Sequence, residues 1–226
     1  NWVQNLIESP TILNKEQPVR NRISVTALDN YQYFLDSDMS EAELRERLFG
    51  DFIPTYAMQA GSAWHKVLEL WQGQTANNQY LQDDFIFDLS VLDCDNKPIV
   101  LGKPWQREQK HVWQGVDGVD LVGKIDVETP FVIIDHKLSV NFDPERYFNS
   151  WQWRAYLTMR NKNKFTYQIF ECEPIDKIKN NTVQIKHYHT LDMYAYDGMQ
   201  KEVMDMVADL SNLIHKWRNR NELNII

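Results

Sequence analysis

Two stretches of almost continuous apolar character lie in the middle of the chain, at 118–128 and 131–137. In the second, Phe131 is followed by three β-branched residues, and runs of this length and type predict strands that are buried on both faces of a sheet. Thr129 and Pro130 separate the two stretches and predict a tight connection between them. We therefore expect two adjacent central strands covered by at least one layer of helices.

Apolar positions three and four residues apart predict helices before and after these strands. Ser24 is a suitable N-cap for a helix that continues to Leu35, and Ser40 with Glu43 has the form of a capping box for a second helix. The expected helices are Ser24 to Leu35, Ser40 to about Phe49, one beginning at Gly61, one over roughly Pro144 to Met159, and a packing helix over 197–220 that begins at Asp197. Further strands are expected at 85–92, 98–101, 165–173 and 182–191.

Length and composition favour one packed domain. The chain has 226 residues, of which 43% are hydrophobic, and eight are tryptophan. That composition is typical of a globular core and not of a disordered chain. We expect a single domain over 1–226, with an extended lead-in at 1–22 and a core at 23–191.

Charge and cysteine content narrow the function. The two cysteines, Cys94 and Cys172, fit neither a zinc pattern nor a four-cysteine iron–sulfur cluster, so a reducing, cytoplasmic location is expected. No signal peptide or membrane-spanning run is evident. A net charge of −8 argues against a non-specific nucleic-acid coat protein but is compatible with an acidic metal site.

Candidate chemistry gathers at the ends of the two central strands. Asp126 lies near the end of the first, and Asp135 and Lys137 near the end of the second. Two carboxylates are the hard oxygen ligands that Mg²⁺ prefers, and a neighbouring ammonium suits phosphodiester cleavage. Because strand side chains alternate, the His136 side chain is expected to point away from both of its neighbours. An Asp-x-Lys triplet alone is common by chance.

Two predicted helices carry polar residues at a spacing of one turn. His65 and Glu69 share a polar stripe, as do Gln152 and Tyr156. Each pair has a functional and a structural interpretation. His65 is also typical of a partly buried helix histidine, Glu69 of a solvated residue, and Tyr156 of a packed aromatic residue.

A basic and aromatic stretch precedes the central strands. Lys103, Trp105, Arg107 and Lys110 alternate in the way that favours phosphate contacts with base stacking. An ordinary surface hairpin explains the same pattern equally well. These four residues are candidates for DNA binding.

In this order the motifs resemble those of the PD-(D/E)xK nuclease superfamily, specifically its RecB-like and lambda-exonuclease-like branch. The resemblance spans residues 23 to about 160. The chain differs from some members of this family because it lacks the cysteines of an iron–sulfur cluster and has no Walker A loop. The matching motifs are 23–28, Gly61-x-x-x-His65 with Glu69, Gly123-x-x-Asp126, Asp135-x-Lys137 and Gln152-x-x-x-Tyr156.

This resemblance implies an α/β fold with a restriction-endonuclease-like core. That core is a central mixed β-sheet flanked by helices, in the order αβββαβ, with helical additions at both ends. One or two Mg²⁺ or Mn²⁺ ions are implied, and no iron–sulfur cluster. Lys137 would orient or deprotonate the attacking water, with a pKa lowered by the metal, and Gln152 and Tyr156 would bind the scissile phosphate or orient Lys137. The implied metal ligands are Asp126, Asp135, the backbone carbonyl of His136, His65 and Glu69.

The implied activity is a divalent-metal-dependent DNA nuclease, with an exonuclease acting on DNA ends in recombination, repair or phage DNA processing as the leading form. The implied partners are DNA and a recombinase, a single-strand-binding protein or a helicase, and homo-oligomers, including rings around DNA, occur among relatives. Two alternatives remain. One is a structure-specific endonuclease of the same fold, and the other is a non-catalytic nucleic-acid-binding or protein-binding module.

Overall fold

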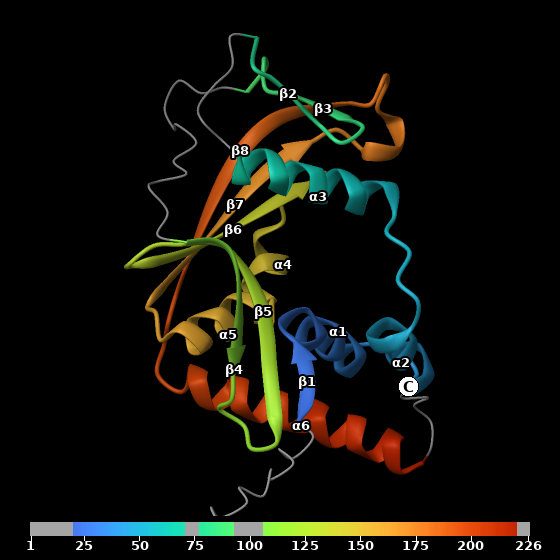
Figure 1. Cartoon of the computed structure of the whole chain (residues 1–226), viewed down its shortest axis with the longest axis vertical. Coiled ribbons are helices and arrows are strands. Elements are labelled where there is room, and N and C mark those ends of the chain that lie inside the picture. The colour runs from blue at the N-terminus through green and yellow to red at the C-terminus, as the bar shows by residue number, and fades with distance from the viewer. Residues whose placement is uncertain (1–19, 71–76, 93–105, 221–226) are drawn as a thin grey trace, which may run out of the picture.

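A mixed eight-stranded sheet with helices on both faces forms the described part of the chain (Figure 1). The computed structural model describes residues 20–70, 77–92 and 106–220. The strands are β1 (Asn21–Ser24), β2 (Gln79–Gln82), β3 (Phe85–Asp88), β4 (Gln106–Trp113), β5 (Val119–Glu128), β6 (Val132–Ser139), β7 (Lys164–Cys172) and β8 (Thr182–Tyr194). The helices are α1 (Val25–Asp36), α2 (Glu41–Phe49), α3 (Tyr56–Glu69), α4 (Pro144–Asn149), α5 (Trp151–Arg160) and α6 (Met199–Asn219), with a 3₁₀ turn at Ile175–Lys177.

The sheet separates two hydrophobic cores. Its strand order is β1-β5-β6-β7-β8-β3-β2, with β4 paired to β5. Phe165 and Tyr167 of β7 face a core shared with α1, α5 and α6. Phe170 of the same strand faces the opposite way and packs on Trp64 of α3, with ring centroids 4.9 Å apart. The alternation along β7 therefore buries both faces of the sheet, as the apolar runs of the sequence predict for the central strands.

A gap opens along one edge of β5. The strand β4 pairs with β5 from 121 to 128, so the remaining partners must share the opposite edge. On that edge β1 pairs with residues 119–122 and β6 pairs only with Val127 and Glu128. Residues 123–126 thus face neither β1 nor β6. Where two strands separate in this way, their backbone N–H and C=O groups need other hydrogen-bond partners. Side chains of the candidate site provide such partners.

The first two predicted helices are confirmed together with their caps. The Ser24 hydroxyl accepts from the Ala27 backbone N–H at 3.1 Å at the start of α1. Ser40 and Glu43 form a reciprocal capping box at the start of α2. The predicted start of α3 at Gly61 is wrong, because Thr55 caps this helix and it begins at Tyr56.

The predicted helix from Pro144 to Met159 is two helices. The chain breaks at Ser150, whose hydroxyl caps α5 by accepting from the Gln152 N–H. The predicted N-cap at Asp197 is also wrong. The last helix begins at Met199 after Gly198, which has φ +90°, a conformation that glycine adopts without strain.

Other boundaries differ by a few residues. Residues 21 and 22 of the expected lead-in belong to β1, the predicted strand at 85–92 ends at Asp88, and β8 continues to Tyr194 beyond the expected end of the core at 191. The sequence analysis did not predict β1, β2 or β4 as strands. The expected strand at 98–101, Lys103, Trp105 and residues 1–19 lie outside the described residues. Within the described ranges, no helix combines the length and the apolar character needed to span a membrane.

Candidate active site

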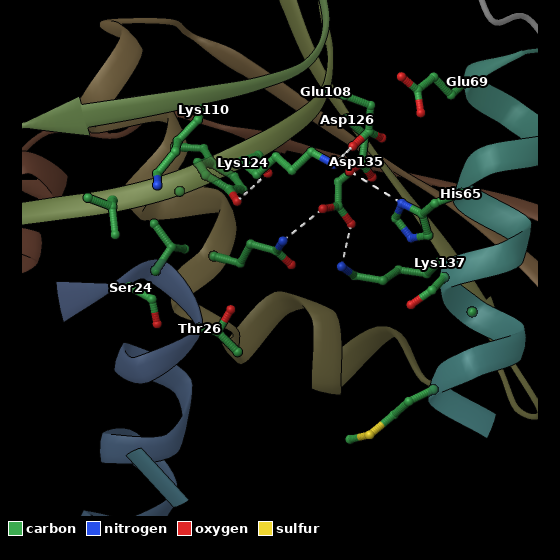
Figure 2. Close-up of a pocket in the computed structure, with 18 of the residues that line it drawn as sticks. Ser24, Thr26, His65, Glu69, Glu108, Lys110, Lys124, Asp126, Asp135 and Lys137 are labelled. Atoms are coloured by element: carbon green, nitrogen blue, oxygen red, sulfur yellow. Dashed lines mark hydrogen bonds and ion pairs between the residues drawn. The ribbon is translucent and has the colours of Figure 1, made fainter. Parts of the chain in front are cut away.

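A cleft of about 1000 Å³ lies between the start of α1, the helix α3 and the diverging strands β5 and β6. Figure 2 shows that its polar side chains come from both sides and point toward one another. Eight sequence candidates line it, whereas the His136 side chain does not. The eight are His65, Glu69, Lys110, Asp126, Asp135, Lys137, Gln152 and Tyr156.

Asp126 projects from the gap in β5. Its Oδ2 atom accepts a hydrogen bond from the backbone N–H of His136 at 2.7 Å. This N–H lies on β6 where the strand has separated from β5, so the carboxylate takes the place of a β5 carbonyl. Its Oδ1 atom lies 3.3 Å from His65 Nδ1. Burial alone would raise the pKa of this carboxyl, but the hydrogen bond and charge of His65 and the charge of Lys137 outweigh it, so the pKa is lowered. Asp126 is therefore a carboxylate at neutral pH.

Asp135 and Lys137 lie side by side on the face of β6 that lines the cleft. Lys137 Nζ is 2.6 Å from Asp135 Oδ2, and Gln152 Nε2 donates to Asp135 Oδ1 at 2.7 Å. Burial raises the pKa of Asp135 to about 6, against the opposing charge of Lys137.

Lys137 is a cation in this arrangement. Burial lowers its pKa, but the charges of Asp135 and Asp126 outweigh burial and raise the pKa above its ordinary value. The lowered pKa implied by the resemblance concerns Lys137 beside a bound metal ion, and it stays a prediction.

Glu108 is a site residue that the sequence analysis missed. It lies on β4 between Arg107 and Gln109, which pair with Val127 and Ile125 of β5, so it stands across from Asp126. Its backbone has φ +55°, which is uncommon for a residue with a side chain. Its carboxylate forms an ion pair with Lys124. No motif in the sequence marks Glu108, because its place depends on the register between β4 and β5.

His65, Glu108 and Asp126 together form a cluster able to hold a cation. One ligand atom from each lies within 4.8 Å of the other two. Burial lowers the pKa of His65, but the hydrogen bond and charge of Asp126 outweigh it and raise the pKa. Two carboxylates and an imidazole suit Mn²⁺ well and Mg²⁺ through the oxygens, so the donor set fits a hard or borderline divalent ion.

Tyr156 and Gly123 fix the exposed edge of β5. The Tyr156 hydroxyl donates to the Lys124 backbone carbonyl at 2.7 Å and does not hydrogen-bond Lys137. A Cβ atom on Gly123 would lie 2.4 Å from Tyr156 Cε1 and 2.9 Å from Val25 Cγ2. The glycine in the Gly123-x-x-Asp126 motif is therefore what allows the tyrosine ring to reach the strand.

The remaining candidates have different positions. Lys110 and Glu69 are exposed at the wall of the cleft, and Glu69 is not part of the cluster formed by His65, Glu108 and Asp126. Arg107 instead donates to the Leu68 and Glu69 backbone carbonyls, at the C-terminal end of α3. This contact satisfies carbonyls that the helix end leaves unpaired, so Arg107 has a structural partner.

His136 faces the core beneath α3, on the side of β6 opposite the cleft. Its ring centroid lies 6.4 Å from that of Phe170 and 6.3 Å from that of His65. Burial lowers its pKa to about 4, so the ring is neutral. The alternation predicted for its side chain agrees with this position. Its backbone carbonyl remains a predicted ligand.

Comparison with known proteins bears on the fold. No protein-family model and no curated protein sequence matches the chain. Among solved structures, the chain is similar to a phage-related exonuclease from Haemophilus somnus 129PT, with a TM-score of 0.51, 10% identity, and coverage of 89% of this chain and 96% of that one. It is also similar to an alkaline exonuclease (LHK-Exo) from Laribacter hongkongensis, with a TM-score of 0.48, 11% identity, and coverage of 89% and 92%.

Strand order and the first of these likenesses together define the class of fold. The chain has a mixed α/β fold of the restriction-endonuclease-like type, with a central mixed sheet flanked by helices. The expected fold class is therefore confirmed. At this level of identity the likeness concerns the fold, and the chemistry rests on the site itself.

Proposed function

We propose that this chain is a divalent-metal-dependent DNA nuclease that hydrolyses phosphodiester bonds at DNA ends. The observation that carries the proposal is the convergence of Asp126, Asp135 and Lys137 at the point where β5 and β6 diverge. A solved structure to which the chain is similar is described as a phage-related exonuclease, which agrees with this proposal. DNA processing in recombination, repair or phage growth is the proposed context.

Asp126, Glu108 and His65 would hold the ion on one side of the cleft, and Asp135 with the His136 carbonyl on the other. A bound Mg²⁺ or Mn²⁺ ion lowers the pKa of a bound water and offsets phosphate charge. Gln152 holds one oxygen of Asp135 and so fixes the direction of the other. Asp135, with a pKa of about 6, is mostly ionised at neutral pH and available as a ligand.

Lys137 contributes a positive charge beside the reacting phosphate. The Lys137 side chain is 30% exposed and lines the cleft, and Asp135 holds its ammonium group, so that group is oriented before any substrate arrives. It would orient the attacking water and stabilise the charge that develops on the phosphate. Tyr156 acts through the Lys124 carbonyl, so its proposed role is to position β5 and with it Asp126.

Digestion of end-labelled DNA tests the activity. Linear single-stranded and double-stranded DNA and covalently closed circular DNA are each incubated with Mg²⁺, with Mn²⁺ and with EDTA. We expect release of nucleotides from linear DNA with either metal and no release in EDTA. Cleavage of the closed circle at the same rate would indicate an endonuclease instead, and binding without cleavage under all conditions would indicate a non-catalytic module.

Two proposed sets of metal ligands differ in one residue. The cluster in the structure contains Glu108, whereas the set implied by the family resemblance contains Glu69. Glu108→Gln is expected to weaken Mn²⁺ binding in calorimetry by about tenfold or more, because a lost carboxylate ligand removes a full charge from the site. Glu69→Gln is the matched control, since Glu69 lines the same cleft outside the cluster. If only Glu69→Gln weakens the binding, the ligand set implied by the family resemblance is correct and Glu108 is not a ligand.

A further inference from the structure

The mouth of the cleft carries an exposed apolar surface that neither the fold nor the proposed chemistry explains. Residues 50–55 connect α2 to α3 and run along the side of the molecule opposite β5 and β6 (Figure 1). Phe52 and Ile53 on this connection are 73% and 84% exposed, and Met58 at the start of α3 is 49% exposed. Phe52 and Met58 line the cleft itself. We call Phe52, Ile53 and Met58 the mouth patch.

The mouth patch is held in place at both ends. The Gly50 N–H donates to Glu46 O at 2.8 Å where α2 ends, and Gln59 Nε2 donates to Pro54 O at 3.1 Å where α3 begins. Tyr56 packs on Phe85 with ring centroids 4.9 Å apart. The exposed side chains therefore belong to a connection anchored between two helices. Adjacent exposed apolar side chains in a soluble protein commonly mark a binding surface.

Charge alone gives the cleft little attraction for a DNA strand. Among the residues that the structure describes, four lysines and four carboxylates line it, so their formal charges cancel. Lys124 is paired with Glu108 and Lys137 with Asp135, and Lys66 is paired with Asp83 at 3.0 Å. Lys110 is left as the exposed cation at the wall. Contacts to bases would add to the binding free energy that a bound metal ion and Lys110 supply through phosphates.

The cleft has a volume of about 1000 Å³, which gives room for a few nucleotides of one strand. In such grooves, exposed aromatic side chains stack on unpaired bases while cations contact the phosphates.

We propose that the cleft takes the unpaired end of a DNA strand, and that Phe52 stacks on one of its bases while Ile53 and Met58 extend the apolar surface. This inference rests on the proposed nuclease function and names its substrate class as single-stranded ends. A base at an unpaired end loses its stacking on the adjacent bases, and the Phe52 ring would provide a stacking surface in their place. Lys110, on the opposite wall, contacts a phosphate of the same strand.

Binding of a fluorescent oligonucleotide tests this inference without turnover. The probes are a 12-nucleotide single strand and its blunt duplex, with Ca²⁺ as the metal, because Ca²⁺ takes carboxylate oxygens. We expect the single strand to bind at least tenfold more tightly than the duplex. Phe52→Ala should weaken single-strand binding about tenfold, since stacking on an aromatic side chain contributes about 1–3 kcal/mol per base. Phe52→Trp should restore it.

Phe131→Ala is the matched control. Phe131 is 81% exposed in the connection between β5 and β6 and does not line the cleft, so its removal should leave binding unchanged. Far-ultraviolet circular dichroism establishes that each variant is folded. Equal binding by Phe52→Ala and the wild type, or equal affinity for the single strand and the duplex, overturns the inference.

The two proposals fail in different ways. If DNA is cleaved in Mg²⁺ but Phe52→Ala binds normally, the nuclease proposal stands and the substrate class is wrong. If no DNA is cleaved but single strands bind through Phe52, the stacking surface stands and the nuclease proposal is wrong.

Discussion

Gly123 is the position where a single methyl group should disturb the site most. A Cβ atom there would lie 2.4 Å from Tyr156 Cε1 and 2.9 Å from Val25 Cγ2, so both neighbours must move. The tyrosine ring cannot move away without lengthening the 2.7 Å hydrogen bond from its hydroxyl to the Lys124 carbonyl. Asp126 follows three residues later on the same segment of β5, which pairs with β4 on one edge and has no strand on the other. Gly123→Ala should therefore lower both stability and metal-dependent activity.

The magnitude follows from two contributions. Overpacking a well-packed region costs about 1–3 kcal/mol. Loss of the hydrogen bond adds about 0.5–1.5 kcal/mol. We expect the free energy of unfolding to fall by about 2–4 kcal/mol, which is a large part of the roughly 5–15 kcal/mol by which a domain is stable.

Urea unfolding of a double-mutant cycle measures this. The variants are Gly123→Ala, Tyr156→Ala and the pair, with Gly61→Ala as a control because nothing lies within 4 Å of a Cβ atom at that position. In the Tyr156→Ala background the cost of Gly123→Ala should fall by at least about 1 kcal/mol, the size of coupling that residues in contact show. Gly61→Ala should raise stability by about 0.5–1 kcal/mol. A Gly123→Ala cost below about 0.5 kcal/mol, or additive costs for the two changes, would refute the proposed contact.

Two further predictions concern charged groups. Metal-free protein in EDTA should lose stability above about pH 6.5, and this loss should depend on His65. The pKa of His65 is higher in the folded protein than in the unfolded chain. Its contribution to stability is therefore complete below the unfolded pKa and is lost as the pH rises through the folded pKa. Urea unfolding from pH 5 to 9 should show the loss in wild type and not in His65→Gln, and identical slopes would contradict it. Glu128→Gln should cost about 2 kcal/mol, because it leaves Arg160 and Lys162 without the buried carboxylate that lies 3.0 Å and 3.5 Å from them; a stability unchanged from wild type would show that the pairing is not stabilising.

The parts of the fold that local sequence determines were predictable. Ser24 and the Ser40–Glu43 box cap their helices through contacts three residues apart, so the sequence contains the whole signal. The strands β5 and β6 were predicted within two residues because a buried strand needs a continuous apolar run.

Features that depend on distant residues were missed or misplaced. The break at Ser150 depends on Asp29 of α1, which accepts from the Ser150 hydroxyl at 2.9 Å and from the Trp151 N–H at 2.6 Å. The helix start predicted at Gly61 is misplaced because Thr55, six residues earlier, provides the cap.

In the candidate site, too, the residues set by local spacing were predictable and those set by distant contacts were not. Asp135 and Lys137 are two residues apart on a strand, and Gln152 and Tyr156 are four apart on a helix, so each pair could be assigned from the sequence. Glu108 could not be assigned, because its place across from Asp126 depends on the register of β4 and on an uncommon backbone conformation. Arg107 had the composition of a phosphate contact, but its guanidinium reaches the carbonyls that end α3.

Lys137 provides the most direct test of the central claim. Nucleotide release from end-labelled linear single-stranded DNA is measured with Mg²⁺ for wild type, Lys137→Ala and Lys164→Ala. The control is matched, since Lys164 is 33% exposed and paired with Asp192 at 2.8 Å, much as Lys137 is paired with Asp135. We expect Lys137→Ala to lose activity by about 10²-fold or more, the size of effect seen when one preorganised charge-stabilising group is removed, and Lys164→Ala to keep it. Unchanged release by folded Lys137→Ala protein would contradict the proposed active site.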